Sequence, residues 1–164
     1  MTVYYFDTSA LVKHYVPEPG SDWVNEVIGA GYGEHAGAHN VILLSEITRP
    51  EVAAGLAAIE RSGRISRARR DREYRRFLSD LVRRFAVVPI RTTDMEGAAD
   101  LTQQHPLKAY DAVQLAIALR CGKALAGHDT KLVFVSGDRT QISAAQAEGL
   151  LTDDPFDHIA PVAE

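Results

Sequence analysis

Residues 2–9 read Thr-Val-Tyr-Tyr-Phe-Asp-Thr-Ser, and this short run sets the pattern for the rest of the chain. The first five side chains are β-branched or aromatic, a composition that favours a short buried strand over 2–6. Asp7, Thr8 and Ser9 follow at once, and each can cap the amino end of a helix over the apolar residues 10–15. The run therefore predicts a strand that leads directly into a capped helix.

The same alternation continues to the end of the chain. Further strands are expected at 41–44, 85–90 and 132–136, with a short fifth strand around 150–152. Further helices are expected over 23–28 capped by Ser21 or Asp22, over 45–61 with Pro50 in the first turn, from about Ser66 up to the third strand, over 93–104 capped by Thr93 or Asp94, over 108–120, and over 139–148. Short apolar strands that alternate with helices predict an α/β fold with a central parallel sheet of four to five strands, covered on both faces.

Length and composition indicate an ordinary globular chain. With 164 residues and 46% hydrophobic side chains, residues 1–164 suffice for a single domain with its own core. One cysteine, Cys121, excludes a disulfide framework and a cysteine-rich zinc module. The amino terminus lacks the features of a signal peptide, and no apolar run is long enough to span a membrane, so we expect a soluble, cytoplasmic protein.

Four acidic residues occupy positions where a parallel sheet places its ligand site. Asp7 and Asp138 follow strands, whereas Glu51 and Asp111 lie near the starts of helices. Because a parallel sheet binds its ligands beyond the carboxyl ends of its strands, all four can face one cavity. Taken singly, an acid at a strand end or a helix start is more often a structural residue, such as a helix cap, than a catalytic one. The other acids near these positions are expected to serve as caps, turns or surface residues; they are Glu46, Asp94, Asp100 and Asp129.

Four carboxylates in one cavity raise one another's pKa, and a divalent cation relieves that repulsion. An all-oxygen ligand set suits Mg²⁺ or Mn²⁺, and such an ion lowers the pKa of bound water and neutralises phosphate oxygens. These are the requirements of phosphodiester hydrolysis. His35 and His39 have the i,i+4 spacing of a zinc pair, but Gly33 and Gly37 predict a loop for the Gly-rich segment 29–40.

Positive charge is concentrated in one segment. Residues 61–84 contain ten arginines and three acids, a local charge of +7 on a chain whose net charge is −4. At helical spacing, Tyr74, Phe77, Leu78, Leu81, Val82 and Phe85 share one face and Arg69, Arg72, Arg76 and Arg83 the opposite one. The arginine face is either a solvated surface with ion pairs along the helix, or a contact surface for nucleic acid or an acidic partner protein.

Four motifs, in order, resemble those of the PIN-domain family, and most closely its VapC toxins. They are Phe-Asp-Thr-Ser-Ala-Leu-Val-Lys at 6–13 with Val-Pro-Glu-Pro-Gly-Ser at 16–21, Leu-Ser at 44–45 with Thr-Arg-Pro-Glu-Val at 48–52, Lys-Ala-Tyr-Asp-Ala-Val-Gln-Leu-Ala at 108–116, and Phe-Val-Ser-Gly-Asp at 134–138. Together they span nearly the whole chain.

The resemblance implies an α/β/α sandwich and a Mg²⁺- or Mn²⁺-dependent endoribonuclease, the toxin of a type II toxin–antitoxin system. It also implies a homodimer that is inhibited by a small antitoxin inserted at the active site. By position, the acidic quartet is Asp7, Glu51, Asp111 and Asp138. Asp7 and Asp111 are the strongest direct metal ligands, Asp138 acts through water or at a second ion, and Thr8 and Ser9 support the site by hydrogen bonds.

Two other functional classes remain open. A phosphotransfer enzyme also places an aspartate after its first strand, but a haloacid-dehalogenase-type site needs a second aspartate where this chain has Ser9. A non-catalytic PIN-like binding module typically loses acidic positions of the quartet, whereas this chain keeps all four.

Overall fold

The computed structural model describes residues 2–30, 40–128 and 130–159. Most of the Gly-rich segment expected to form a loop, including His35 and His39, lies outside the described residues, as does Asp129. None of the helices in the described part is long and apolar enough to cross a bilayer.

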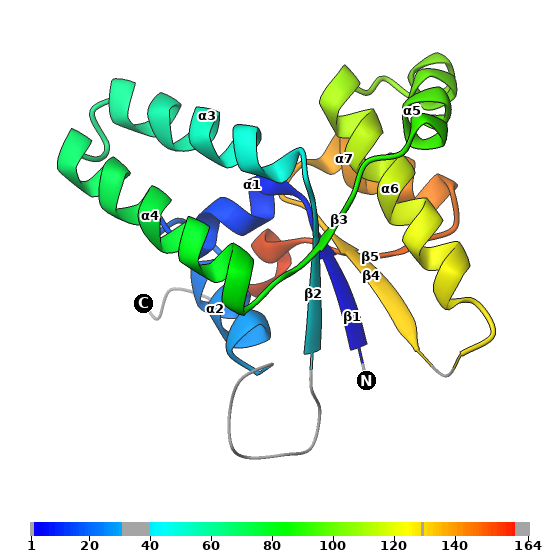
Figure 1. The fold of residues 1–164 in the computed structure, drawn as a ribbon, viewed down its shortest axis with the longest axis horizontal. Coiled ribbons are helices and arrows are strands. Elements are labelled where there is room, and N and C mark those ends of the chain that lie inside the picture. The colour runs from blue at the N-terminus through cyan, green and yellow to red at the C-terminus, as the bar shows by residue number, and fades with distance from the viewer. Residues whose placement is uncertain (1, 31–39, 129, 160–164) are drawn as a thin grey trace.

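A five-stranded parallel sheet forms the centre of the molecule (Figure 1). Its strands are β1 (Thr2–Phe6), β2 (Asn40–Ser45), β3 (Ala86–Val88), β4 (Lys131–Val135) and β5 (Leu151–Asp153). They lie in the order β3-β2-β1-β4-β5, so the first strand is the central one. The predicted fold class is confirmed, including the short fifth strand. The third strand is shorter than predicted, since only 86–88 pair with β2.

Helices cover both faces of this sheet. One face carries α1 (Thr8–Leu11), the 3₁₀ turn η1 (Val12–His14), α2 (Ser21–Gly29), α3 (Thr48–Arg61) and α4 (Arg67–Arg83). The other face carries α5 (Thr92–Gln104), α6 (Ala109–Leu125) and α7 (Arg139–Ala147). A last 3₁₀ turn, η2 (Pro155–His158), packs against α2. Figure 1 shows α3 and α4 side by side, on the opposite side of the sheet from α5 and α6.

The sheet separates two hydrophobic cores. Side chains alternate along β1, so Phe6 enters the core under α1 to α4 while Val3 and Tyr5 enter the core under α5 to α7. Phe6 and Tyr5 are completely buried. Burying one such large side chain contributes roughly 1.5–3 kcal/mol, so both layers hold the central strand firmly in register.

Two helices begin differently from the prediction. Helix α2 follows Gly20 in a left-handed conformation (φ 86°), and Ser21 does not cap it but bonds the 3₁₀ turn through the Lys13 carbonyl. A side chain at position 20 would lie 2.4 Å from the Pro155 carbonyl oxygen, so glycine allows η2 to close over this helix start. Helix α5 is capped from inside its first turn, where Asp94 accepts the backbone N–H of Arg91 at 2.8 Å.

The apolar face predicted for helix α4 is confirmed except at Val82: Phe77 and Phe85 are buried, and Tyr74, Leu78 and Leu81 pack against the same core. The buried face extends to two acids that the prediction left outside. Glu73, Phe77 and Asp80 are its buried residues, whereas Val82, expected in the core, is 86% exposed. Asp80 turns inward because it accepts a hydrogen bond from the buried Tyr15 hydroxyl at 3.0 Å. Two carboxylates that look solvent-facing in the sequence therefore anchor the helix.

Candidate active site

The first acid of the site, Asp7, is buried at the carboxyl end of the central strand. It is also the N-cap of α1, because its Oδ2 accepts the backbone N–H of Ser9 at 3.0 Å. The Ser136 hydroxyl, which follows β4, lies 3.3 Å from the same oxygen. Asp7 is thus held from both its own helix and the neighbouring strand.

Glu51 reaches the same edge from the first turn of α3. Its Oε2 accepts two hydrogen bonds, from the Thr8 hydroxyl at 2.7 Å and from the Gln114 side-chain amide at 2.6 Å. Thr8 is the residue after Asp7, so the second acid is tied to the chain segment that carries the first.

Asp111 and Asp138 lie at the starts of the two helices on the other face of the sheet. Asp111 is in the first turn of α6, and Asp138 is the N-cap of α7, with Oδ1 accepting the backbone N–H groups of Thr140 (2.8 Å) and Gln141 (3.4 Å). The side-chain amide of Gln141 donates to the backbone carbonyl oxygen of Asp111 at 3.2 Å. This bond links the starts of α6 and α7.

Electrostatic coupling shows that these four acids share one neighbourhood. Burial raises the pKa of Glu51, and the negative charges of Asp7 and Asp111 raise it further against two lowering hydrogen bonds. Burial also raises the pKa of Asp111, followed by the charges of Asp7 and Asp138. The acids predicted from the sequence are therefore placed together at one edge, although they come from four different elements.

Three of the acids bind the protein through a single oxygen. Asp7 uses Oδ2, Glu51 uses Oε2 and Asp138 uses Oδ1, while the second oxygen of each has no hydrogen bond from another described residue. An acidic set in which one oxygen is anchored and the other is open has the donor chemistry that Mg²⁺ and Mn²⁺ prefer. Within the described ranges, however, no three of the acidic, histidine and cysteine side chains are already grouped as a metal site.

Polar side chains that the sequence reasoning did not single out complete the walls. Gln114, Ser136 and Gln141 are almost completely buried, and each bonds at least one residue of the acidic site. A signal was available for the first: it is a lone amide in the apolar run of α6, three residues after Asp111, which is one turn along the same face.

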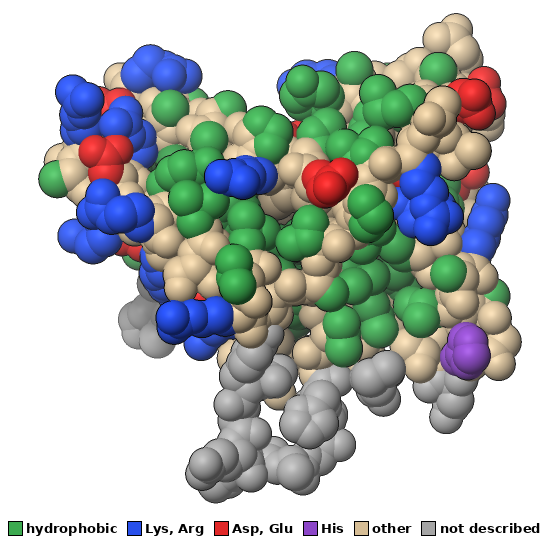
Figure 2. Space-filling view, in the orientation of Figure 1, with side chains coloured by type: hydrophobic (Ala, Val, Ile, Leu, Met, Phe, Trp, Pro, Cys, Tyr) green, Lys and Arg blue, Asp and Glu red, His purple; other side chains and the backbone are tan. Residues whose placement is uncertain are grey.

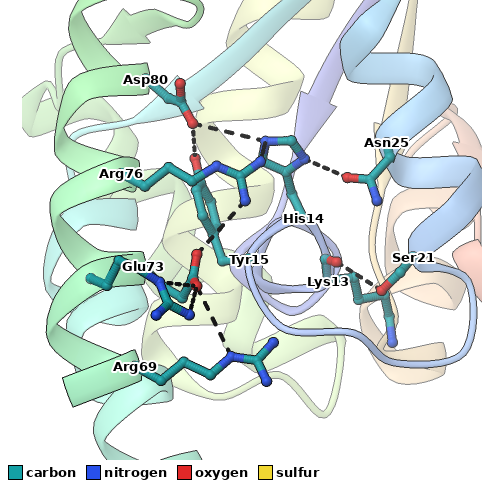
Figure 3. A network of polar contacts seen from close by, with 10 residues as sticks. Lys13, His14, Tyr15, Ser21, Asn25, Arg69, Glu73, Arg76 and Asp80 are labelled. Carbon is teal, nitrogen blue, oxygen red and sulfur yellow. Dashed lines mark hydrogen bonds and ion pairs between the residues drawn. The ribbon is translucent and has the colours of Figure 1, made fainter. Parts of the chain in front are cut away.

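The predicted arginine face forms a separate region on α4, where Lys and Arg side chains gather (Figure 2). Arg69, Arg72 and Arg76 surround the buried Glu73, with nitrogen–oxygen distances of 4.0, 3.0 and 3.7 Å. Figure 3 shows Arg69, Glu73 and Arg76 beside η1 and α2, where they line a cavity of about 490 Å³. Arg83 makes no ion pair among the residues described.

His14 joins α4 to η1 within the same network (Figure 3). Its Nδ1 lies 2.6 Å from the Asn25 side-chain oxygen, and its Nε2 lies 3.1 Å from Arg76. An arginine can only donate, so Nε2 accepts, the Nδ1–H donates to Asn25, and the ring is neutral. Burial, followed by opposing effects of its polar neighbours, lowers the pKa of His14.

Comparison with known proteins places this arrangement in a family. The sequence model of the PIN domain matches residues 4–138, which include all four acids. The chain belongs to the PIN-domain family. The resemblance seen in the four motifs is thereby confirmed.

Relatives of this PIN domain extend the comparison to nearly the whole chain. It is 31% identical over 154 residues to ribonuclease VapC45 of Mycobacterium tuberculosis (strain CDC 1551 / Oshkosh), covering 91% of this chain and 93% of the relative. VapBC2 from Rickettsia felis, bound to a promoter DNA fragment, has a similar fold (TM-score 0.60, 14% identity, 93% of this chain, 98% of that one). A toxin–antitoxin complex from Klebsiella pneumoniae is also similar (TM-score 0.57, 21% identity, 93% and 98%).

Proposed function

We propose that this PIN domain is an endoribonuclease, the toxin component of a type II toxin–antitoxin system, and that it acts as a single domain in the cytoplasm. The observation that carries the proposal is the coupled acidic site formed by Asp7, Glu51, Asp111 and Asp138. The names of its relatives, which include a ribonuclease and a toxin–antitoxin complex, point in the same direction.

The chain's own residues prepare the site for a divalent cation. Asp7, Glu51 and Asp111 would hold Mg²⁺ or Mn²⁺, with Asp138 orienting water or helping a second ion. When bound, such an ion supplies an acidified water and neutralises charge that develops on phosphate. The Ser9 and Ser136 contacts hold Asp7 in place, and the backbone N–H groups of α7 hold Asp138, so each carboxylate is oriented before a ligand arrives.

The substrate and partners follow from the charges outside this site. RNA needs a cationic surface to approach an acidic one, and within the described part of the chain the ion pairs of Arg69, Arg72 and Arg76 with carboxylates all go to Glu73. The face with Arg83 is proposed to guide the RNA backbone. A small antitoxin and a second copy of the chain complete the proposed assembly, in keeping with the toxin–antitoxin complex among the similar structures.

The test is cleavage of total RNA with Mn²⁺ and with EDTA. Wild-type protein is expected to cleave only with the metal, and Asp7→Asn is expected to lose cleavage while it keeps a cooperative thermal transition. Full cleavage by Asp7→Asn would refute the assignment. Trapping of Asp7 by beryllofluoride would instead indicate a phosphotransfer enzyme.

A further inference from the structure

Gln114 uses its side chain fully at the wall of the acidic site. The residue is completely buried. Its Oε1 accepts the Tyr5 hydroxyl at 2.7 Å and the Ser45 hydroxyl at 2.9 Å. Its Nε2 donates to Glu51 at 2.6 Å and to the Thr48 hydroxyl at 3.2 Å. The two acceptor sites and two donors of an amide are therefore all satisfied.

The orientation of this amide is fixed by its neighbours. If it were turned over, Oε1 would face Glu51 Oε2, and two acceptors would stand at hydrogen-bond distance without a proton between them. The hydroxyls of Tyr5 on β1 and Ser45 on β2 donate to Oε1 and hold the opposite end. The Nε2–H group must therefore point at Glu51.

The consequence for Glu51 is a division between its two oxygens. Gln114 and Thr8 both donate to Oε2, and Oε1 receives no hydrogen bond from the residues described. We propose that Gln114 is a positioning residue for Glu51, which anchors one carboxylate oxygen and so presents the other to the divalent cation. This inference rests on the proposed function, because it concerns the same metal site.

Part of the role of Gln114 is structural, because its Oε1 accepts the buried hydroxyls of Tyr5 and Ser45, but that part does not require a donor directed at Glu51. The neighbours of Gln114 in α6 are apolar and buried, and an aliphatic side chain would fill that volume without the desolvation of an amide. Gln114 lies one turn after Asp111, so α6 carries one acid of the site, Asp111, and donates a hydrogen bond to another, Glu51.

The experiment measures the Kd for Mn²⁺ by electron paramagnetic resonance, with no RNA present. Gln114→Leu removes the donor at similar volume and is expected to weaken Mn²⁺ binding about 10–100-fold, the usual effect of losing a group that orients a metal ligand. In a Glu51→Gln background, the same change is expected to alter the Kd less than about two-fold, because the residue it acts through is gone.

Arg120→Gln is the matched control. Arg120 lies on the same helix and makes two hydrogen bonds to the buried Asp94, so its loss removes a buried polar contact away from the acidic site. This variant is expected to melt at a lower temperature and to keep the wild-type Kd. If Gln114→Leu fails to fold, it is combined with Tyr5→Phe/Ser45→Ala, which removes the two buried hydroxyls that lost their acceptor, and the Tyr5→Phe/Ser45→Ala protein serves as its reference.

Each outcome bears on a separate statement. A wild-type Kd in Gln114→Leu, or an unchanged Kd between the triple variant that replaces it and its Tyr5→Phe/Ser45→Ala reference, overturns the positioning role. An equal loss with and without Glu51 overturns it as well. Wild-type protein that binds Mn²⁺ but cleaves no RNA contradicts the proposed function. The role of Gln114 is then still decided by the Kd values, since these need no RNA. Wild-type protein that binds no Mn²⁺ overturns both.

Discussion

At the scale of single residues, the acidic site works against folding in the absence of metal. The fold raises the pKa of Asp111, through burial first and then through Asp7 and Asp138, so the folded state favours the protonated carboxyl. A folded-state pKa above the unfolded value means that the contribution of this group to stability is fully present below the unfolded pKa and is lost as the pH rises through the folded-state pKa. At neutral pH the ionised Asp111 carboxylate therefore lowers the stability of the fold, and the proposed metal site needs it in this ionised form.

Asp111→Asn is therefore expected to stabilise the metal-free protein at pH 7. The gain is expected to be small, roughly 1–3 °C in Tm, because the carboxyl is only partly buried and solvent screens part of the repulsion. It should shrink as the pH approaches 3.8, the ordinary pKa of an aspartate, where the repulsion is absent from the wild type as well. Denaturant unfolding in EDTA at pH 4 and pH 7 measures the difference. Equal gains at both pH values would exclude an electrostatic origin.

His14 gives a dependence on pH of the opposite sign. Burial lowers its pKa below the ordinary value of 6.5, and Arg76 and Arg84 lower it further, against raising effects of Asn25 and Asp80. The unfolded chain then binds the proton more readily, so stability is complete above pH 6.5 and is lost as the pH falls through the folded-state pKa. His14→Gln is expected to be less stable at pH 7.5 and to lose less stability between pH 7.5 and 5.5, measured by urea unfolding. An unchanged pH slope would place the titration elsewhere.

At the scale of elements, some features of α4 could be predicted from the sequence and others could not. Its limits and its arginine content follow from local pattern, and Ser66 caps it at 3.2 Å through the Arg69 N–H. The burial of Glu73 and Asp80 does not follow from local pattern. Their partners lie at η1 and on the same helix, and the contacts with η1 form only in the folded chain. Charged residues are seldom buried unless they are paired, so a prediction from sequence places Glu73 and Asp80 on the surface.

The arginine face is expected to contact RNA with part of its charge. In an Asp7→Asn background, which prevents cleavage, Arg72→Gln/Arg83→Gln is expected to weaken RNA binding and to reduce the slope of log K against log salt by up to about 1.4, since each lost contact to single-stranded RNA contributes roughly 0.7. Fluorescence anisotropy at several salt concentrations measures both quantities.

Lys123→Gln/Lys131→Gln is the control for this experiment. It removes the same charge from exposed positions, and Lys131 begins β4 at the edge of the sheet opposite to the acids. Its salt slope should match that of the parent. A slope that is also unchanged in the arginine variant would exclude the α4 face as the RNA contact surface.

The position of the acidic site could be predicted from the topology of the sheet, whereas the burial of the two α4 acids could not. Parallel strands share the direction of their carboxyl ends, so Asp7 and Asp138 are brought to one edge by topology alone. Helix α3 begins at that edge because it follows β2, which adds Glu51, and α6 begins there because it leads back to the start of β4, which adds Asp111. The supporting contacts could not be predicted this way. Gln114 meets Tyr5 across 109 positions, and Arg120 meets Asp94 across 26, and neither separation leaves a mark on local pattern.

At the scale of the whole molecule, the proposed cation would join the end of β1, α3 and α6, and it should stabilise all three. A cation held by Asp7, Glu51 and Asp111 binds the folded state alone, and at 100 times its Kd this contributes about 2.7 kcal/mol. For a chain of this length we expect a rise in Tm of roughly 5–10 °C with Mn²⁺, reversed by EDTA. Scanning calorimetry of wild type and Asp7→Asn tests this, and a rise of equal size in Asp7→Asn would place the ion elsewhere.

The central position of β1 has a consequence for synthesis of the protein on the ribosome. Asp7 emerges among the first residues, yet Ser136, which braces it, follows 129 positions later. β1 lacks one of its two neighbours until β4 has left the exit tunnel. A chain that ends before residue 136 therefore lacks both the brace of Asp7 and the fourth acid, Asp138, so the proposed site is complete only after β4 has been made.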